Sequence, residues 1–155
     1  MNITEPDCIP EICIRDFQKD SPNLLIISLN ELFNKHSSII TKPHRICYYQ
    51  LLMINEATGC LNIDSKKYNL KPKSVIPQAK GNVECFEFNK NKDYIKLGNM
   101  GYAILFTEEY LYKYPEDLVW INSLRLFDIS ISPYLLKLST IEYDESFKFI
   151  VLYSR

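Results

Sequence analysis

The sequence predicts a mainly β protein, arranged as an antiparallel sandwich or barrel. Short segments rich in aliphatic and aromatic residues follow one another closely from Glu11 to Phe88, and turn-forming residues separate them. Such spacing favours antiparallel pairing, because parallel strands need long helical crossovers. The stretch Ile46–Ile54 is apolar and almost free of charge, which is typical of a central strand that is buried on both faces.

Other strands are expected on either side of this central one. Their segments are Asn23–Ser28, Cys60–Asp64, Lys67–Lys71, Ser74–Gln78, Val83–Phe88 and Tyr102–Phe106. The breaks between them carry glycine, proline, asparagine or aspartate, which favour turns, as in Asn55–Gly59, Asp64–Ser65, Lys71–Lys73 and Gln78–Asn82. Each strand is therefore expected to be short and to end in a tight connection.

The alternation of residues in Val83–Phe88 places Glu84 and Phe86 on the same face of a strand. Two interpretations of this acid are open: Glu84 lies in water at the mouth of the barrel, or it points into a cavity. The residue types alone favour the first, because aromatic side chains belong to a core and carboxylates to solvent.

The pattern becomes helical after the strand that follows Gly101. Thr107 can cap a helix that ends before Pro115, and the two acids after Thr107 suit the helix dipole. We expect three further elements, namely a helix Glu116–Leu124, a short strand Leu135–Leu138 and a helix from Asp144. The last helix reaches Arg155 without a cap, so we expect the natural chain to continue. Residues 1–155 are interpreted as one domain, with a β-barrel over 11–106 and a helical extension over 107–155 for dimerisation or linkage.

The composition excludes several classes of function. The chain has 155 residues, of which 46% are apolar and 24% charged, as in a globular protein. A net charge of −1 lacks the basic excess that phosphates require, so we expect no nucleic-acid binding by these residues themselves. No signal-peptide pattern is present, and no apolar run approaches the roughly 20 residues that span a bilayer. We therefore expect a cytoplasmic protein without membrane contact.

The cysteines form neither a C-x-x-C pair nor an even set, since they are Cys8, Cys13, Cys47, Cys60 and Cys85. We expect no disulfide framework and no zinc site, and we interpret the thiols as free and mostly buried in a reducing compartment. A reactive cysteine would need a neighbour that stabilises its thiolate, and the sequence offers none that stands out.

The segment Pro43–Leu52, with the pattern Pro-His-Arg-x-x-Tyr-Tyr-Gln-Leu-Leu, resembles the first motif of the AraC-type cupin family. Later segments match that family in order and spacing, namely Gly59, Ile63–Asp64, Tyr68–Pro72, Pro77, Gly81–Phe86, Gly101–Leu111 and Leu126–Asp128. The resemblance covers roughly Ile12 to Tyr153. It implies a cupin-like antiparallel β-barrel (a double-stranded β-helix, or jelly roll) followed by two or three C-terminal α-helices.

The resemblance also locates the place where metal-binding cupins hold their ion. Those proteins use a His-x-His pair, a carboxylate and a further histidine, and the corresponding residues here are His44, Ile46, Gln50 and Glu84. Isoleucine cannot ligate, and a neutral amide oxygen is a poor ligand for a transition metal. We therefore expect no bound metal, no cofactor, no catalytic residue and no enzymatic activity.

The same positions predict a pocket for a small organic effector. If no bulge intervenes, alternation places five residues of the first motif on one face, and Glu84 and Phe86 join them. The candidate ligand-binding residues are His44, Ile46, Tyr48, Gln50, Leu52, Glu84 and Phe86. The alternative interpretation is that these side chains simply fill a small barrel without a ligand.

The resemblance implies the ligand-sensing and dimerisation domain of an AraC-family transcription regulator. In that family the sensor barrel forms homodimers through its late helices, and a C-terminal pair of helix-turn-helix units, absent from this chain, binds DNA. Two alternatives are a stand-alone cupin enzyme or sugar-binding protein with a degenerate metal site, and a structural barrel that binds a partner. The degenerate metal ligands argue against the enzyme.

Overall fold

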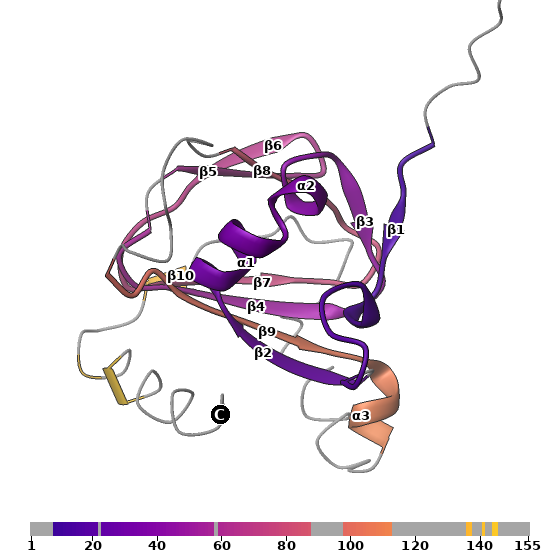
Figure 1. The fold of residues 1–155 in the computed structure, drawn as a ribbon. Helices are drawn as coiled ribbons and strands as arrows, with labels where there is room; N and C mark the ends of the chain where they lie inside the picture. Colours follow the sequence, from indigo (N-terminus) through magenta and orange to yellow (C-terminus); the bar gives the residue numbers. More distant parts are fainter. Residues whose placement is uncertain are drawn as a thin grey trace, which may run out of the picture.

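Two five-stranded β-sheets face each other and enclose the core, as Figure 1 shows. The computed structural model describes residues 8–21, 23–57, 59–87, 98–112, 136–137, 141 and 144–145. In these residues the elements are β1 Glu11–Ile12, the 3-10 helix η1 Ile14–Asp16, β2 Leu24–Ser28, α1 Leu29–Lys35, α2 Ser37–Ile40, β3 His44–Ile46, β4 Tyr49–Ile54, β5 Cys60–Ile63, β6 Lys66–Asn69, β7 Ser74–Gln78, β8 Val83–Glu87, β9 Gly101–Phe106, α3 Glu108–Tyr112 and β10 Leu136–Lys137. The predicted mainly β class is confirmed.

The strands divide between the sheets in an order that brings distant segments together. The first sheet has the order β1-β3-β8-β5-β6, and the second has the order β10-β7-β4-β9-β2. The described pairings are antiparallel except that between β1 and β3, which is parallel. Inner side chains of both sheets and of the helices between them form one apolar cluster. Burial of this cluster supplies the main driving force for the fold.

The predicted central strand Ile46–Ile54 is wrong as one continuous element. The chain leaves the first sheet at the end of β3, bends at Cys47 and Tyr48, and enters the second sheet as β4. The expected alternation nevertheless survives the bend, and the residues that it places together are all at most 1% exposed: His44, Ile46, Tyr48, Gln50 and Leu52. Inward-facing side chains therefore continue from one sheet to the other along a single motif.

The helices α1 and α2 were not predicted, because this part of the sequence was interpreted as β-rich. Ser28 caps α1, and its hydroxyl accepts a hydrogen bond from the Glu31 amide at 3.1 Å. Leu29, Leu32 and Phe33 follow at helical spacing and are buried. The cap followed three residues later by glutamate was therefore a visible start signal. Figure 1 shows both helices lying between the sheets, with α1 against β2 and β9 and α2 against β8.

The predicted turns and the late elements agree with the structure where it describes them. The β5–β6 hairpin turns at Asp64 and Ser65, whose φ angles of 48° and 70° suit a two-residue hairpin turn. Thr107 caps α3, since its hydroxyl accepts from the Tyr110 amide at 3.3 Å. The strand β10 lies within the predicted Leu135–Leu138.

The predicted helix Glu116–Leu124 and most of the helix from Asp144 lie outside the described residues. Among the helices that the structure does describe, none is long and apolar enough to cross a membrane.

Candidate functional site

Two cross-strand pairs of polar residues meet between the sheets. His44 of β3 lies opposite Glu84 of β8 in the first sheet, and Gln50 of β4 lies opposite Gln78 of β7 in the second. Each of these four side chains belongs to a residue that is at most 1% exposed. We call the four residues the buried polar cluster. Because the two sheets face each other, the polar pair of the first sheet meets the polar pair of the second sheet between them.

Glu84 is the hub of the buried polar cluster. Its Oε1 lies 2.9 Å from His44 Nε2, while its Oε2 accepts hydrogen bonds from Gln50 Nε2 at 3.1 Å and from Gln78 Nε2 at 2.5 Å. The Gln50 amide also donates to Gln78 Oε1 at 2.5 Å. Both carboxylate oxygens therefore have hydrogen-bonding partners, which offsets the cost of burying an acid.

His44 is held by oxygen atoms on both sides of its ring. Its Nδ1 lies 2.8 Å from the Lys42 carbonyl oxygen, and its Nε2 faces Glu84. A carbonyl oxygen can only accept, so Nδ1 carries a proton, and the protonated ring can donate in both directions. Burial lowers the pKa of His44, but the hydrogen bond and charge of Glu84 and the bond to Lys42 outweigh it and raise the pKa above 6.5. These contacts therefore favour the protonated form of the His44 ring more than water does.

The interpretation of Glu84 as an acid in water at the barrel mouth is wrong. The residue is 1% exposed and lies among polar partners from both sheets. Residue type alone could not show this, because its partners are remote in the sequence. The predicted face itself is confirmed, since Phe86 is also buried whereas Glu87 is exposed.

Gln78 is the member of the cluster that the sequence analysis missed. It was assigned only as the end of a strand before a turn. A signal was available, because Ser74, Ile76 and Gln78 alternate on one face of β7 and would share the environment of the inner residues of β4. The register between β4 and β7 decides the pairing, and that register was not predictable from the two segments separately.

The apolar members of the predicted site belong to the core. Ile46, Leu52 and Phe86 are all part of the apolar cluster between the sheets. The Phe86 ring meets that of Phe33 edge to face, with ring centroids 5.2 Å apart. These three side chains pack in the core, and none of them lines the pocket that the structure describes, so their predicted role in a ligand pocket stays a prediction.

Tyr48 differs from the other predicted residues because its hydroxyl has no partner. In the described part of the chain it is the buried side-chain oxygen or nitrogen without a hydrogen bond. Burial, followed by the nearby charge of Glu84, raises its pKa well above 10.0. A buried hydroxyl without a partner costs on the order of 1–3 kcal/mol, and no described residue offsets this cost with a hydrogen bond.

A pocket of about 230 Å³ opens beside Tyr48, at the ends of β4, β7 and β9. We call it the rim pocket. The residues that line it are Cys47, Tyr48, Tyr49, Lys80, Thr107, Glu108, Glu109 and Tyr112. Glu108 accepts hydrogen bonds from the hydroxyls of Tyr49 at 3.0 Å and Tyr112 at 3.3 Å. Burial and then the bond to Glu108 raise the pKa of Tyr49 to about 12, so it remains a donor.

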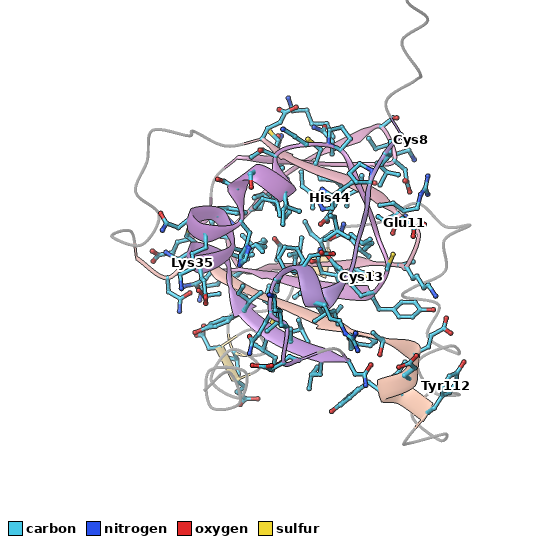
Figure 2. The ribbon with its side chains drawn as sticks, turned by 45° about the vertical axis from the view of Figure 1, so that its right-hand side comes forward. Cys8, Glu11, Cys13, Lys35, His44 and Tyr112 are labelled. Atoms are coloured by element: carbon cyan, nitrogen blue, oxygen red, sulfur yellow. The ribbon has the colours of Figure 1, made fainter. Side chains whose placement is uncertain are left out.

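The rim pocket and the buried polar cluster are neighbours along two strands. Tyr48 and Tyr49 directly precede Gln50, and Lys80 follows Gln78 by two residues. Figure 2 labels His44 inside the ribbons of the sheets and Tyr112 on α3 at the periphery. Tyr48 is the predicted site residue that also lines the rim pocket.

The residues that the resemblance to cupins aligns with a metal site do not fit a metal ion. The described part of the chain holds no group of three or more His, Cys, Asp or Glu residues placed for ligation. His44 could ligate only by giving up the interaction of Nε2 with Glu84 or of Nδ1 with Lys42. The donors that remain are too few for a zinc or iron site.

No family model matches the chain, and no curated protein matches it.

Proposed function

We propose that this chain is the effector-sensing domain of an AraC-type transcription regulator, with a cupin-like barrel that binds a small organic molecule without a metal. The observation that carries the proposal is the buried, unpartnered hydroxyl of Tyr48, a residue that also lines the rim pocket. Small-molecule sites combine apolar walls with a few convergent polar groups, and this region has both.

The buried polar cluster supports the proposal as the rigid side of the site. Its four members are hydrogen-bonded to one another, so it can hold Tyr48 and the start of β4 in a fixed position. The rim pocket supplies the accessible side, with Tyr49, Glu108 and Tyr112 already joined by hydrogen bonds. An effector at Tyr48 would therefore contact a preformed surface, which lowers the entropic cost of binding.

The late helices supply the route to a response. Glu108 and Tyr112 lie on α3, at the beginning of the extension that the resemblance assigns to dimerisation. A molecule that contacts α3 in one arrangement of the domains and not in another shifts the balance between those arrangements. The proposed homodimer and the DNA-binding half of the regulator belong to this part of the proposal.

A thermal-shift screen tests effector binding directly. The purified protein is melted with panels of sugars, amino acids and small organic acids. A compound present at a hundredfold excess over its Kd stabilises by about 2.7 kcal/mol, which corresponds to a melting temperature raised by roughly 5–10 °C. We expect Tyr48→Phe to lose most of that shift and Tyr110→Phe to keep it, because Tyr110 belongs to α3 but does not line the rim pocket. A screen without any stabilising compound, or a full shift in Tyr48→Phe, contradicts the proposed site.

The regulator class has a separate test in the natural gene. The proposal requires a reading frame that continues past Arg155 into a DNA-binding domain with two helix-turn-helix units. A reading frame that stops at Arg155 contradicts the regulator while leaving a ligand-binding barrel in place.

A further inference from the structure

The cysteines are more accessible than the sequence analysis expected. Cys8 and Cys13 are exposed, and Cys47, Cys60 and Cys85 are half-buried, so the interpretation of mostly buried thiols is wrong. Their residue type favours burial, but Cys8 and Cys13 belong to the N-terminal stretch, and Cys47, Cys60 and Cys85 alternate with buried neighbours and therefore face outward. Accessible thiols can take part in exchange reactions, which makes their mutual positions informative.

Cys13 and Cys47 are placed side by side by the parallel pairing of β1 with β3. Ile12 lies opposite Ile46, and the Cys47 amide donates to the Ile12 carbonyl at 3.0 Å. Cys13 continues this pairing by one residue, because its φ of −110° and ψ of 167° keep it extended. Neighbouring strands lie about 4.8 Å apart, within the range of about 4.4–6.8 Å between the Cα atoms of disulfide-bonded residues.

The side chains of the two cysteines also lie on the same side of the sheet. Along β1 and its extension, Glu11 and Cys13 are exposed whereas Ile12 is half-buried. Along β3, Ile46 is buried and Cys47 points to the opposite, outer side. The Cys47 thiol donates to Glu11 Oε2 at 3.7 Å and also interacts with the Cys13 side chain. Figure 2 labels Cys8, Glu11 and Cys13 along this N-terminal stretch.

We propose that Cys13 and Cys47 form a reversible disulfide that ties the N-terminal stretch to the wall of the rim pocket. The oxidant is a small-molecule disulfide of the glutathione type. This proposal is independent of the proposed effector function, since it rests on the pairing of β1 with β3. Its consequence is local, because Cys47 directly precedes Tyr48 and lines the rim pocket.

The reaction proceeds by two thiol–disulfide exchanges. The exposed Cys13 thiolate attacks the small disulfide, forms a mixed disulfide and releases one small thiol. Cys47 then attacks the Cys13 sulfur, the protein disulfide forms, and the second small thiol leaves. Burial, together with Cys13 and Glu11, raises the pKa of Cys47 to about 12, so Cys47 loses its proton as it attacks, and the departing small thiolate takes up that proton. The high pKa makes the second step slow, so the equilibrium must be measured after long incubation.

Peptide mapping tests the pairing without ambiguity. The protein is equilibrated with oxidised and reduced glutathione, its remaining thiols are alkylated, and it is cleaved after glutamate. This cleavage places the cysteines on separate peptides: Cys8 in 1–11, Cys13 in 12–31, Cys47 in 32–56, Cys60 in 57–84 and Cys85 in 85–87. We expect peptides 12–31 and 32–56 to be joined in the native protein. Free thiols at Cys13 and Cys47 in excess oxidised glutathione, or another dominant pairing, overturn the proposal.

Thermal unfolding gives a second measurement that does not depend on mapping. Closing the loop between Cys13 and Cys47 restricts the unfolded chain, and we expect oxidation to raise the melting temperature by roughly 5–10 °C. The rise should disappear in Cys13→Ser and in Cys47→Ser and persist in Cys60→Ser, the matched control on β5. A rise that persists in Cys13→Ser overturns the assignment of the pair.

Discussion

The buried polar cluster and the rim pocket lie next to each other but treat their polar groups in opposite ways. In the cluster, His44, Gln50, Gln78 and Glu84 are almost fully withdrawn from water and are bonded to one another. In the rim pocket, Lys80 and Glu109 are exposed and have no hydrogen bond or ion pair in the described part of the chain. The polar groups of the cluster are therefore hydrogen-bonded within the fold, whereas Lys80 and Glu109 of the rim pocket are open to solvent.

The difference follows from the cost of burial. A polar group removed from water without a partner destabilises the fold, by on the order of 1–3 kcal/mol, so groups between the sheets must satisfy one another. At the end of the sheets water can solvate a charge, and no such pairing is required. Tyr48 combines features of both regions, because its hydroxyl is buried like the cluster but has no hydrogen-bonding partner. We therefore expect the cluster to contribute mainly to stability, and the proposed function places effector binding at the rim pocket.

Removal of the hub should have the largest effect on stability. Glu84→Ala leaves a buried imidazole and two amides without their shared acceptor, and we expect a loss of about 3–5 kcal/mol. Denaturant unfolding followed by circular dichroism measures it. Glu87→Ala on the same strand is the control and should cost little, since the Glu87 side chain is 52% exposed. Equal small losses in both variants would mean that the cluster does not stabilise the fold.

Removal of one amide should have an intermediate effect. Gln78→Leu deletes one donor to Glu84 and the acceptor of Gln50, but His44 and Gln50 still bond the carboxylate. We expect a loss of about 1–3 kcal/mol in the same unfolding measurement. Gln18→Leu, at an exposed position, is the matched control. A Gln78→Leu protein as stable as the wild type would show that the hydrogen bonds of Gln78 do not contribute to the free energy of unfolding.

The pH dependence of stability should report on His44. Its folded-state pKa is raised above the unfolded value near 6.5, so its contribution is complete below about pH 6.5 and is lost as the pH rises through the folded value. His36 has the opposite shift, caused mainly by burial, and opposes folding only as the pH falls. Unfolding free energies measured between pH 6.5 and 8.5 should therefore decrease in the wild type. The decrease should vanish in His44→Asn and remain in His36→Asn; a flat wild-type profile contradicts a raised pKa of His44 in the folded protein.

Removal of the unpartnered hydroxyl should raise stability slightly. Tyr48→Phe deletes a buried group that has no hydrogen bond, and we expect a gain of about 1 kcal/mol in the absence of ligand. The same variant should lose the ligand-dependent thermal shift. A loss of stability would show that the hydroxyl has a partner in solution and would weaken its assignment to binding.

Charge removal in the rim pocket should have the smallest effect on the fold. Lys80→Ala and Glu109→Ala should change the free energy of unfolding by no more than about 0.5 kcal/mol, because both side chains are exposed. Their effect should appear in the thermal shift produced by a compound from the screen. Large losses of stability in these variants would remove the contrast between the two regions.

Much of the fold could be predicted from local patterns, whereas the candidate site could be predicted only in part. The segments Cys60–Asp64 and Ser74–Gln78 correspond to β5 and β7, because alternation and turn residues act over a few neighbours. Alternation also placed His44 and Gln50 on one inward face, and Glu84 on the same strand face as Phe86, although the residue types favoured Glu84 in water. Gln78 was missed because its role depends on its register opposite Gln50, and the rim pocket was missed because α3 comes from a later part of the chain.

The sequence by itself determined the mainly β class, the turn positions, the capped start of α3 and the inward face of the first motif. These features depend on side-chain period, backbone conformation and capping, which are properties of short segments. The tertiary structure alone decided that Ile46–Ile54 bends from one sheet into the other, that Glu84 is buried, and that Cys13 lies beside Cys47. Those outcomes depend on the pairing of strands that are remote in sequence, and the free energy that selects such pairings exists only in the assembled core.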